Sequence, residues 1–405
     1  MKKEKKIVLY VGNFCFPFGN AAGKRVYANG KIFKDLGYEV IFIGVNKGIN
    51  SLDSFKVKKL YKNFIYYELS YPVRNIDWLK YRSAFSEFEM LLKSEEIIDD
   101  LILVIYYGSP RVSLFNKMLI NYCNKRGVKV VADCVDWLTT RTNNFVFDIV
   151  KWADNTYQKA YVNKKVDGLI VISNYLSNFY SKYGCKTIIV PPLSPNCYCI
   201  EKRTFVDEKK NITYAGLPFR KGQKIKDRSK LKDRIDKTIE LFYQAKSDGY
   251  DFNFNIYGFT EEEYLQAFPD QVVYLDKLGD SIIFHGYKSN KTVVKSIIDS
   301  DFTILIRDVN RDTTAGFPTK VSESISCGTP VIATPTSDLE GYVKDGRNGY
   351  FLSLTDRRDA LMKFKEILKL NKSEVERIKE YCKMNNVFCY KNYVLTVKVF
   401  LENIL

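Results

Sequence analysis

Residues 317–334 read FPTKVSESISCGTPVIAT and place two ionisable side chains, Lys320 and Glu323, one helical turn apart before an apolar run. Lysine and glutamate seldom enter a packed interior unless a partner or ligand requires them there. A lysine near a helix N-terminus suits phosphate oxygens, and a carboxylate one turn later can accept two hydrogen bonds from a ribose. The spacing therefore predicts a site for a nucleotide diphosphate. The alternative is a surface i,i+3 ion pair worth about 0.3 kcal/mol.

The surrounding sequence predicts the elements that position this pair. The pattern indicates a strand at Phe302–Ile306, a loop over Arg307–Thr319 and a short helix over Val321–Cys327 that ends at Gly328. Thr319 is the predicted N-cap of this helix. Because the loop follows the carboxyl end of a strand, where open parallel sheets bind ligands, Lys320 is expected on the wall of a ligand cleft.

Composition limits the class of protein. The chain has 405 residues, of which 46% are hydrophobic and 27% charged, a balance typical of soluble proteins with two large domains. No apolar run approaches the length of a membrane span. The start MKKEKK runs into a strand pattern at Ile7–Gly12 without a small-residue cleavage site. We therefore expect a cytoplasmic protein.

The formal charge of +16 permits nucleic acid, an anionic membrane or a phosphorylated substrate as partner. Basic clusters lie at 2–6, at 56–62 and at 220–234. The second is interleaved with Leu60, Tyr61, Phe64 and Tyr66, which suits an anionic membrane surface; the alternative is that these aromatics are core strand residues and the lysines only solubilise the fold. No recognition helix, zinc module or aromatic RNA-binding pattern favours nucleic acid.

Nine cysteines and one histidine give no metal-site spacing, because no CxxC pair occurs. We therefore expect no metal, no cofactor and no disulfide framework. Cys197 and Cys199 are interpreted as two unrelated thiols. His285 is interpreted as packing locally at a strand end.

Two α/β domains are predicted from repeated strand–loop–helix units. Strands at Ile7–Gly12, Glu39–Gly44, Leu101–Tyr107, Val128–Asp133, Gly168–Ser173 and Thr187–Pro191 belong to the first. Strands at Asn211–Ala215, Phe252–Gly258, Ile282–Gly286, Phe302–Ile306 and Pro330–Thr334 belong to the second. The run PPLSPN at 191–196 is the predicted linker. The domains are 1–196 and 197–385, and the helical segment 386–405 is expected to pack back on the first domain.

Four stretches resemble retaining glycosyltransferases of family 4, also called group 1, which have the GT-B fold. The most specific is residues 317–334 with the following DLEGYVKDGRNGYF. The others are ITYAG (212–216) with LKDRIDKTIELF (231–242), IIFHGY (282–287) and the weaker FPFGNAAGKRVYANGKIFKDLGYEV (16–40). The resemblance implies two doubly wound Rossmann-like domains facing each other across a cleft, with a nucleotide-diphosphate sugar as the donor substrate.

The resemblance also implies roles for particular residues. Three residues are expected to bind the donor diphosphate and ribose and are therefore predicted to be catalytic: Lys232, Lys320 and Glu323. Further donor-binding residues are Gly216, Tyr287, Arg307, Phe317, Pro318 and Thr319. The acceptor-side residues are Gly19, Gly23, Arg25, Asp133 and Asp136. Lys221 competes with Lys232 for the phosphate, and Lys232 is favoured because it directly precedes the matching helix. Asp133 and Asp136, near Trp137, have an equal alternative as helix caps.

One residue departs from the family pattern: Ala315 stands where many members carry a glutamate that contacts the donor sugar. The predicted function is metal-independent transfer of a hexose, with retention, to a hydroxyl of a glycan or lipid-linked saccharide, in bacterial surface polysaccharide synthesis. The predicted location is the cytoplasm, peripherally on the inner face of the membrane. The alternatives are a sugar-nucleotide epimerase of the same fold, which needs acid–base residues at the sugar, and a basic nucleic-acid-binding protein.

Overall fold

A computed structural model describes residues 6–46, 57–70, 84–95, 97–108, 113–137, 145–196, 209–353 and 355–405. Most of the basic cluster at 2–6, Lys56, Cys197 and Cys199 lie outside these ranges. The chain divides into two compact units, Met1–Pro195 with Tyr390–Leu405 and Asn196–Cys389.

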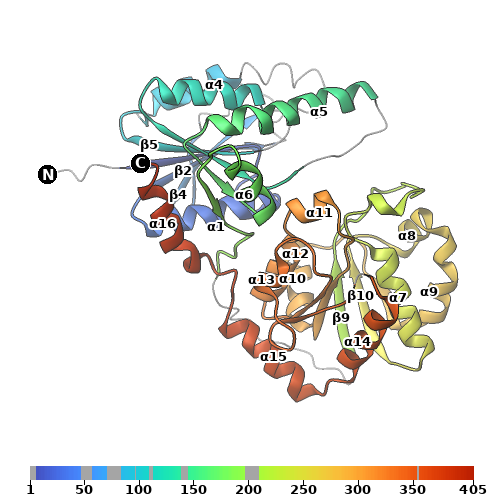
Figure 1. Cartoon of the computed structure of the whole chain (residues 1–405). Helices are drawn as coiled ribbons and strands as arrows, with labels where there is room; N and C mark the ends of the chain where they lie inside the picture. The colour runs from blue at the N-terminus through green and yellow to red at the C-terminus, as the bar shows by residue number, and fades with distance from the viewer. Residues whose placement is uncertain are drawn as a thin grey trace. The chain divides into compact units, whose positions relative to one another are not determined.

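The first unit is built on a sheet that has eight strands among the described residues, in the order β3-β4-β2-β1-β5-β6-β7-β8. The strands are β1 (Ile7–Gly12), β2 (Glu39–Asn46), β3 (Lys59–Tyr61), β4 (Phe64–Ser70), β5 (Leu101–Tyr107), β6 (Lys129–Cys134), β7 (Gly168–Val171) and β8 (Thr187–Ile189). All pairings are parallel except β3 with β4. Its helices are α1 (Ala21–Asp35), α3 (Ala84–Ser94), α4 (Ser113–Asn124), α5 (Phe145–Ala160), α6 (Asn174–Ser181) and α16 (Val394–Glu402) (Figure 1).

The hairpin of β3 and β4 decides between the two interpretations of the aromatics at 60–66. Tyr61 packs edge-on against Phe16, Phe18 and Tyr27, with ring centroids 5.6–6.1 Å apart. Phe64 is 3% exposed. These side chains therefore belong to the packing of the first unit, and Leu60, at 72% exposed, is the apolar residue that the hairpin leaves open to solvent.

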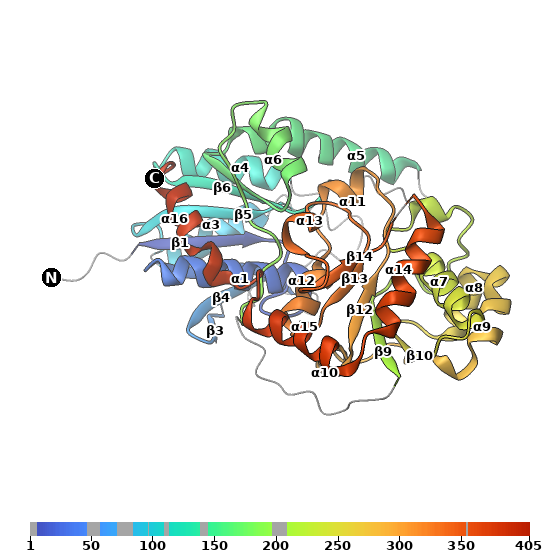
Figure 2. The same cartoon turned by 60° about the horizontal axis from the view of Figure 1, so that its bottom comes forward.

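The second unit has a six-stranded parallel sheet in the order β11-β10-β9-β12-β13-β14. Its strands are β9 (Lys210–Ala215), β10 (Phe252–Tyr257), β11 (Ile282–Phe284), β12 (Phe302–Leu305), β13 (Val331–Ala333) and β14 (Gly349–Phe351). Its helices are α7 (Ile235–Ser247), α8 (Glu261–Ala267), α9 (Val272–Leu278), α10 (Asn290–Asp299), α11 (Arg311–Ala315), α12 (Thr319–Ser326), α13 (Leu339–Tyr342), α14 (Arg357–Lys369) and α15 (Lys372–Met384). Helices cover both faces of the sheet (Figure 2). This is the doubly wound order, in which the direction of winding reverses between β9 and β12.

The chain returns to the first unit at its end. After a short 3-10 turn at Tyr390–Tyr393, Phe400 of α16 and Ile404 just after it are buried close to Gly168, whose missing Cβ leaves the room that the Phe400 ring occupies. The Lys186 ammonium donates to the carbonyl oxygen of Asn403 at 2.7 Å. The last segment therefore completes the core beside β7 and β8.

One feature of the cysteines was not predicted. Cys389 is disulfide-bonded, whereas the expectation concerned only the absence of a disulfide framework. The other described cysteines form no disulfide, so the partner of Cys389 lies outside the described residues. An odd number of cysteines without paired spacing carries no signal for a single bond between distant positions.

Candidate functional site

The candidate site of the second unit lies where β9 and β12 end side by side. These strands are neighbours in the sheet, and the winding reverses between them. Gly216 follows β9, and the segment from Ile306 to Pro318 follows β12 and leads into α12. Parallel doubly wound sheets bind ligands at such a point, because the connections on its two sides diverge and leave a crevice.

A buried carboxylate organises this point. Asp233 is 4% exposed and accepts hydrogen bonds from the Lys320 ammonium at 2.5 Å and from the Tyr214 hydroxyl at 3.0 Å. Arg307 donates to its other oxygen through Nε and Nη2, both at 2.8 Å. Two cations surround one anion, so the three ionised groups carry a net charge of +1.

The electrostatics keep Asp233 ionised. Burial by itself would raise the pKa of Asp233, but Lys320 and Arg307 lower it by more, so the pKa lies well below the usual range of an aspartate. Burial and the neighbouring Asp233 raise the pKa of the Tyr214 hydroxyl, so tyrosine stays protonated and continues to donate. The carboxylate therefore fixes both cations at neutral pH.

Gly216 provides the room for Lys320. A Cβ atom at position 216 would lie 2.4 Å from Cε and 2.6 Å from Nζ of Lys320, closer than real Cβ contacts. A side chain at position 216 would have to displace the end of the Lys320 side chain. Gly216, which was predicted to bind the donor, therefore lies directly beside this lysine.

Lys320 and Glu323 both come from α12 and line one small cavity of about 330 Å³ together with Ala215 and Thr303. The structure therefore brings the two residues of the predicted pair together. Thr319 is not the N-cap that the sequence predicted. The helix begins at Thr319 itself, Pro318 occupies the N-cap position and no side chain caps the helix there.

Arg307 keeps an unused donor. The side chain is 4% exposed, and within the described residues its Nη1 has no hydrogen-bond partner. A buried guanidinium N–H without a partner is costly, so such groups usually mark a place where a ligand or water belongs. Nη1 of Arg307 is thus a donor available to a ligand beside Asp233 and Lys320.

The remaining predicted donor residues are placed differently. Phe317 is 4% exposed and packs on Tyr342 and Phe388 at 5.3 and 5.8 Å between ring centroids, so its ring supports the loop. Pro318 is buried and Thr319 exposed. The Tyr287 side chain is 83% exposed.

The two lysines that competed for the phosphate also differ. Lys232 is exposed and immediately precedes Asp233. Lys221 is 86% exposed and forms an ion pair with Glu263 at 3.2 Å. Ala315, which replaces the glutamate of the family pattern, is fully buried at the end of α11. His285 packs locally: its ring stacks on Tyr257 at 4.3 Å.

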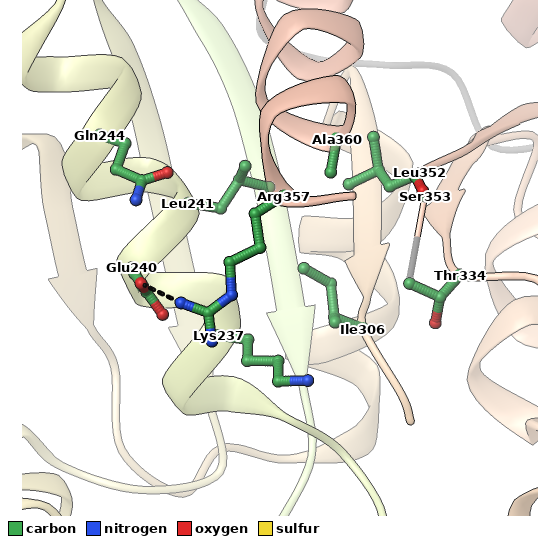
Figure 3. Close-up of a pocket in the computed structure, with 10 residues that line it drawn as sticks. All are labelled: Lys237, Glu240, Leu241, Gln244, Ile306, Thr334, Leu352, Ser353, Arg357 and Ala360. Carbon is green, nitrogen blue, oxygen red and sulfur yellow. Dashed lines mark hydrogen bonds and ion pairs between the residues drawn. The ribbon is translucent and has the colours of Figure 1, made fainter. Parts of the chain in front are cut away.

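A pocket of about 550 Å³ lies between α7 and α14 in the same unit (Figure 3). Glu240 and Arg357 form an ion pair across it at 3.1 Å. Lys237 also lines the pocket, and its ammonium donates to Asp308 at 2.6 Å. These charges are paired within the protein, and no role in the predicted chemistry follows for them.

The acceptor-side residues of the first unit form a second buried ion pair. Asp133 is fully buried and Arg25 is 5% exposed, and Nη2 of the arginine lies 2.8 Å from the carboxylate. The Tyr10 hydroxyl donates to the same carboxylate, and Arg25 also donates to the carbonyl oxygen of Val190 at 2.9 Å. Asp133 belongs to β6 and caps no helix, so this placement differs from both interpretations made for it.

Gly19, just before α1, and Gly23, in the first turn of α1, allow close packing. A Cβ at Gly23 would meet the carbonyl oxygen of Cys15 at 2.2 Å, and one at Gly19 would meet the Cys15 Cβ at 2.5 Å. Asp136 is exposed and lines a cavity of about 660 Å³ with Asn155 and Lys159. Of the predicted acceptor-side residues, Asp136 is the one whose side chain faces open space in such a cavity.

Sequence reasoning missed Asp233, although it stands next to the favoured Lys232. The role of this carboxylate is to hold two cations. The available signal was an Asp between basic residues directly before a helix that starts at a strand-end loop. In the part of the chain that the structure describes, no group of three or more His, Cys, Asp and Glu residues has the geometry of a metal site.

Comparison with known proteins confirms the resemblance over the second unit and the fold over the whole chain. Residues 226–385 match the family described as "Glycosyl transferases group 1", and this segment contains Asp233, Lys320 and Glu323. No curated protein sequence matches the chain significantly.

Three solved structures show the fold class. Sucrose-phosphate synthase from Thermosynechococcus elongatus is 12% identical, with a TM-score of 0.67 and 98% of each chain covered. Anabaena Alr3699/HepE in complex with UDP and glucose is 11% identical, with a TM-score of 0.59 and 98% of this chain and 99% of that chain covered. The catalytic domain of Starch Synthase IV from Arabidopsis thaliana, bound to ADP and acarbose, is 11% identical, with a TM-score of 0.66, and 99% of this chain and 100% of that chain are covered. The predicted GT-B fold class is confirmed.

Proposed function

We propose that this chain is a glycosyltransferase that moves a hexose from a nucleotide-diphosphate sugar to a hydroxyl of a glycan or lipid-linked saccharide, in bacterial surface polysaccharide synthesis. The observation that carries the proposal is the cluster of Lys320, Arg307 and Asp233 at the strand-end crevice, with Glu323 one turn along α12. This cluster lies within the segment that matches group 1 glycosyl transferases.

The proposed donor site uses each group for one part of the donor. The spare Nη1 of Arg307 and the Lys320 ammonium bind diphosphate oxygens, and Asp233 holds both cations in place before the donor arrives. Glu323 accepts hydrogen bonds from the ribose hydroxyls. The Lys320 side chain is 29% exposed, so its ammonium can meet a phosphate oxygen while it stays paired with Asp233.

The proposed reaction proceeds with retention. The bond between the anomeric carbon and the diphosphate oxygen breaks, and the acceptor hydroxyl forms its bond to the same face of that carbon. The hydroxyl proton passes to the leaving diphosphate oxygen, so no protein nucleophile is required. Lys320 and Arg307 stabilise the charge that develops on the diphosphate, and one such donor contributes about 3–4 kcal/mol to transition-state stabilisation. Two fixed cations supply this charge, so we propose that the reaction needs no metal.

A binding measurement tests the donor site first. We expect UDP, ADP or GDP to raise the Tm of the purified protein, with UDP and ADP as the first choices because Alr3699/HepE and Starch Synthase IV were solved with them. The shift should disappear in Lys320→Ala and Glu323→Ala and persist in Lys209→Ala, a control in the same unit whose side chain is 48% exposed. Absence of a shift with every nucleotide diphosphate would contradict the proposal.

A product assay then tests the chemistry. Release of the nucleoside diphosphate from a panel of nucleotide sugars, with transfer of the labelled hexose to lipid-extracted or glycan acceptors, would identify the donor. Appearance of an epimerised sugar without transfer would instead favour an epimerase. We propose a cytoplasmic protein that works peripherally on the inner face of the membrane. No helix in the described part of the chain has the length and apolar character of a membrane span.

A further inference from the structure

Helix α5 turns apolar side chains to solvent and polar side chains toward the interior. Its solvent side exposes Ile149 at 48%, Val150 at 61% and Trp152 at 68%. Its inner side carries Lys151 at 9% and Gln158 at 6% exposed. A surface helix of a globular protein normally turns its apolar stripe to the core and its polar face to water.

Hydrogen bonds on the inner side fix this orientation. Ser113 of α4 donates to Asp154 at 2.5 Å, and Asn116 of α4 donates to Gln158 at 3.0 Å. Gln158 donates in turn to Asn163 at 2.5 Å. Turning the apolar stripe inward would break this buried network, because each of these polar groups would lose its partner. The apolar side of α5 is therefore locked outward.

The neighbouring helix extends the apolar surface. The hydrogen bonds just described set α4 and α5 side by side and parallel (Figure 1). On its outer side α4 exposes Leu114 at 37% and Met118 at 43%. We call the surface formed by Leu114, Met118, Ile149, Val150 and Trp152 the α4–α5 face. The positions of α5 that are described as exposed are Ile149, Val150, Trp152, Ala153, Thr156 and Ala160, and none is charged.

Lysines and tyrosines border the α4–α5 face near the C-terminal end of α5. The Lys117 ammonium lies 5.8 Å from the ring centroid of Tyr157 and 5.7 Å from that of Tyr161. The Lys165 ammonium lies 4.3 Å from the Tyr161 ring, and the two tyrosine rings stack at 5.2 Å. Aromatic rings with cations beside them match the boundary between lipid headgroups and acyl chains, where rings and long lysine stems are half immersed.

We propose that the α4–α5 face docks on an anionic membrane surface. The apolar residues would enter the headgroup boundary while Lys117 and Lys165 meet lipid phosphates, a combination that needs both an apolar and an anionic partner. A second copy of the chain fits less well, because a two-fold contact would bring the same lysines together in a protein of net charge +16. The inference rests on the proposed function in one respect: a lipid-linked acceptor would be met at this surface.

Vesicle co-sedimentation of the full-length protein tests the docking. We expect binding to vesicles of phosphatidylglycerol and phosphatidylcholine, and at least tenfold weaker binding to phosphatidylcholine alone. The triple variant Ile149→Ser, Val150→Ser, Trp152→Ser, called the α5 variant, should bind vesicles at least tenfold more weakly. The double variant Lys117→Gln, Lys165→Gln should bind severalfold more weakly and should no longer distinguish anionic from neutral vesicles. The matched control Leu395→Ser, Val399→Ser alters exposed apolar residues of α16, at 71% and 50%, and should bind normally.

Three outcomes would overturn the docking proposal. One is equal recovery in the supernatant with every vesicle. Another is that a Lys58→Gln, Lys59→Gln, Lys62→Gln variant loses vesicle binding while the α5 variant binds normally, which would assign docking to the β3–β4 hairpin. The third is a lipid-free dimer in analytical ultracentrifugation that the α5 variant abolishes, which would assign the face to a second copy.

The nucleotide measurement separates this inference from the proposed function. The α5 variant should keep the Tm shift given by the nucleotide diphosphate, since its substituted residues belong to the other unit from Lys320 and Glu323. A wild-type protein that binds vesicles but no nucleotide would refute the donor site alone. A protein that binds nucleotide but no vesicle would refute the docking alone.

Discussion

Replacing Asp233 with asparagine should destabilise the second unit strongly. The substitution keeps the size of the side chain but removes the charge that pairs with Lys320 and Arg307. Arg307 would then be a buried cation facing an amide. Breaking a buried ion pair by removal of one partner costs about 3–5 kcal/mol, chiefly because the remaining charge stays uncompensated. For a unit of this size we expect the Tm to fall by roughly 10 °C.

Differential scanning calorimetry is the assay, because it can resolve separate transitions of the two units. Asp251→Asn is the matched control: this carboxylate is 57% exposed, pairs with Lys246 at 2.6 Å and should change the Tm little. Lys320→Met should destabilise less than Asp233→Asn, since Asp233 keeps both bonds from Arg307 and one from Tyr214. A loss below about 1 kcal/mol in Asp233→Asn would refute the claim that this carboxylate organises the site.

Four further predictions concern the same site. Lys320→Ala and Glu323→Ala should each lower kcat by roughly 10²–10³-fold while circular dichroism stays unchanged; near-normal turnover at saturating donor would show that the donor site is wrongly assigned. We also propose the exposed Lys232 as a further phosphate ligand: Lys232→Met should raise the KM for the donor and Lys221→Met should not, and the reverse result would favour Lys221. EDTA should leave turnover unchanged, because fixed lysine and arginine charges stabilise the leaving group; activity lost in EDTA and restored by magnesium or manganese would contradict this. The pKa of Asp233 in the folded protein lies below its unfolded value of about 3.9, so its contribution to stability is present above that pH and is lost as the pH falls through the folded pKa. The free energies of unfolding of wild type and Asp233→Asn, measured by chemical denaturation, should therefore converge on acidification below about pH 4. A difference that stays constant with pH would count against this.

The order of strands and helices was predictable because each parallel strand is a short apolar run between turn residues. Phe302–Leu305 and Val331–Ala333 illustrate this, since every residue in them except Thr303 is buried and both follow a helix that ends in polar residues. The hairpin of β3 and β4 was not predicted as such, because its lysines and aromatics fit a membrane surface as well as a strand. Only the contacts of Tyr61 with Phe16 and Tyr27 distinguish the two.

The sequence predicted the pair of Lys320 and Glu323, but it did not predict the carboxylate that holds Lys320 in place. Lys320 and Glu323 lie close in sequence on one short helix, so their spacing alone brings them together. Asp233 lies 87 residues before Lys320, and no local pattern reports a contact over that separation. The same holds for Arg25 and Asp133, 108 residues apart, whose types suggested chemistry at an open surface although they pair in the interior.

The return of α16 to the first unit has a consequence for synthesis on the ribosome. The second unit is one continuous stretch, Asn196–Cys389, whereas the first needs Tyr390–Leu405 to finish its core. Until those residues leave the exit tunnel, the surfaces of β7 and β8 that receive Phe400 and Ile404 remain uncovered. We therefore expect the nascent first unit to be a chaperone client through translation of the whole second unit, which inverts the usual rule that the N-terminal domain is finished first.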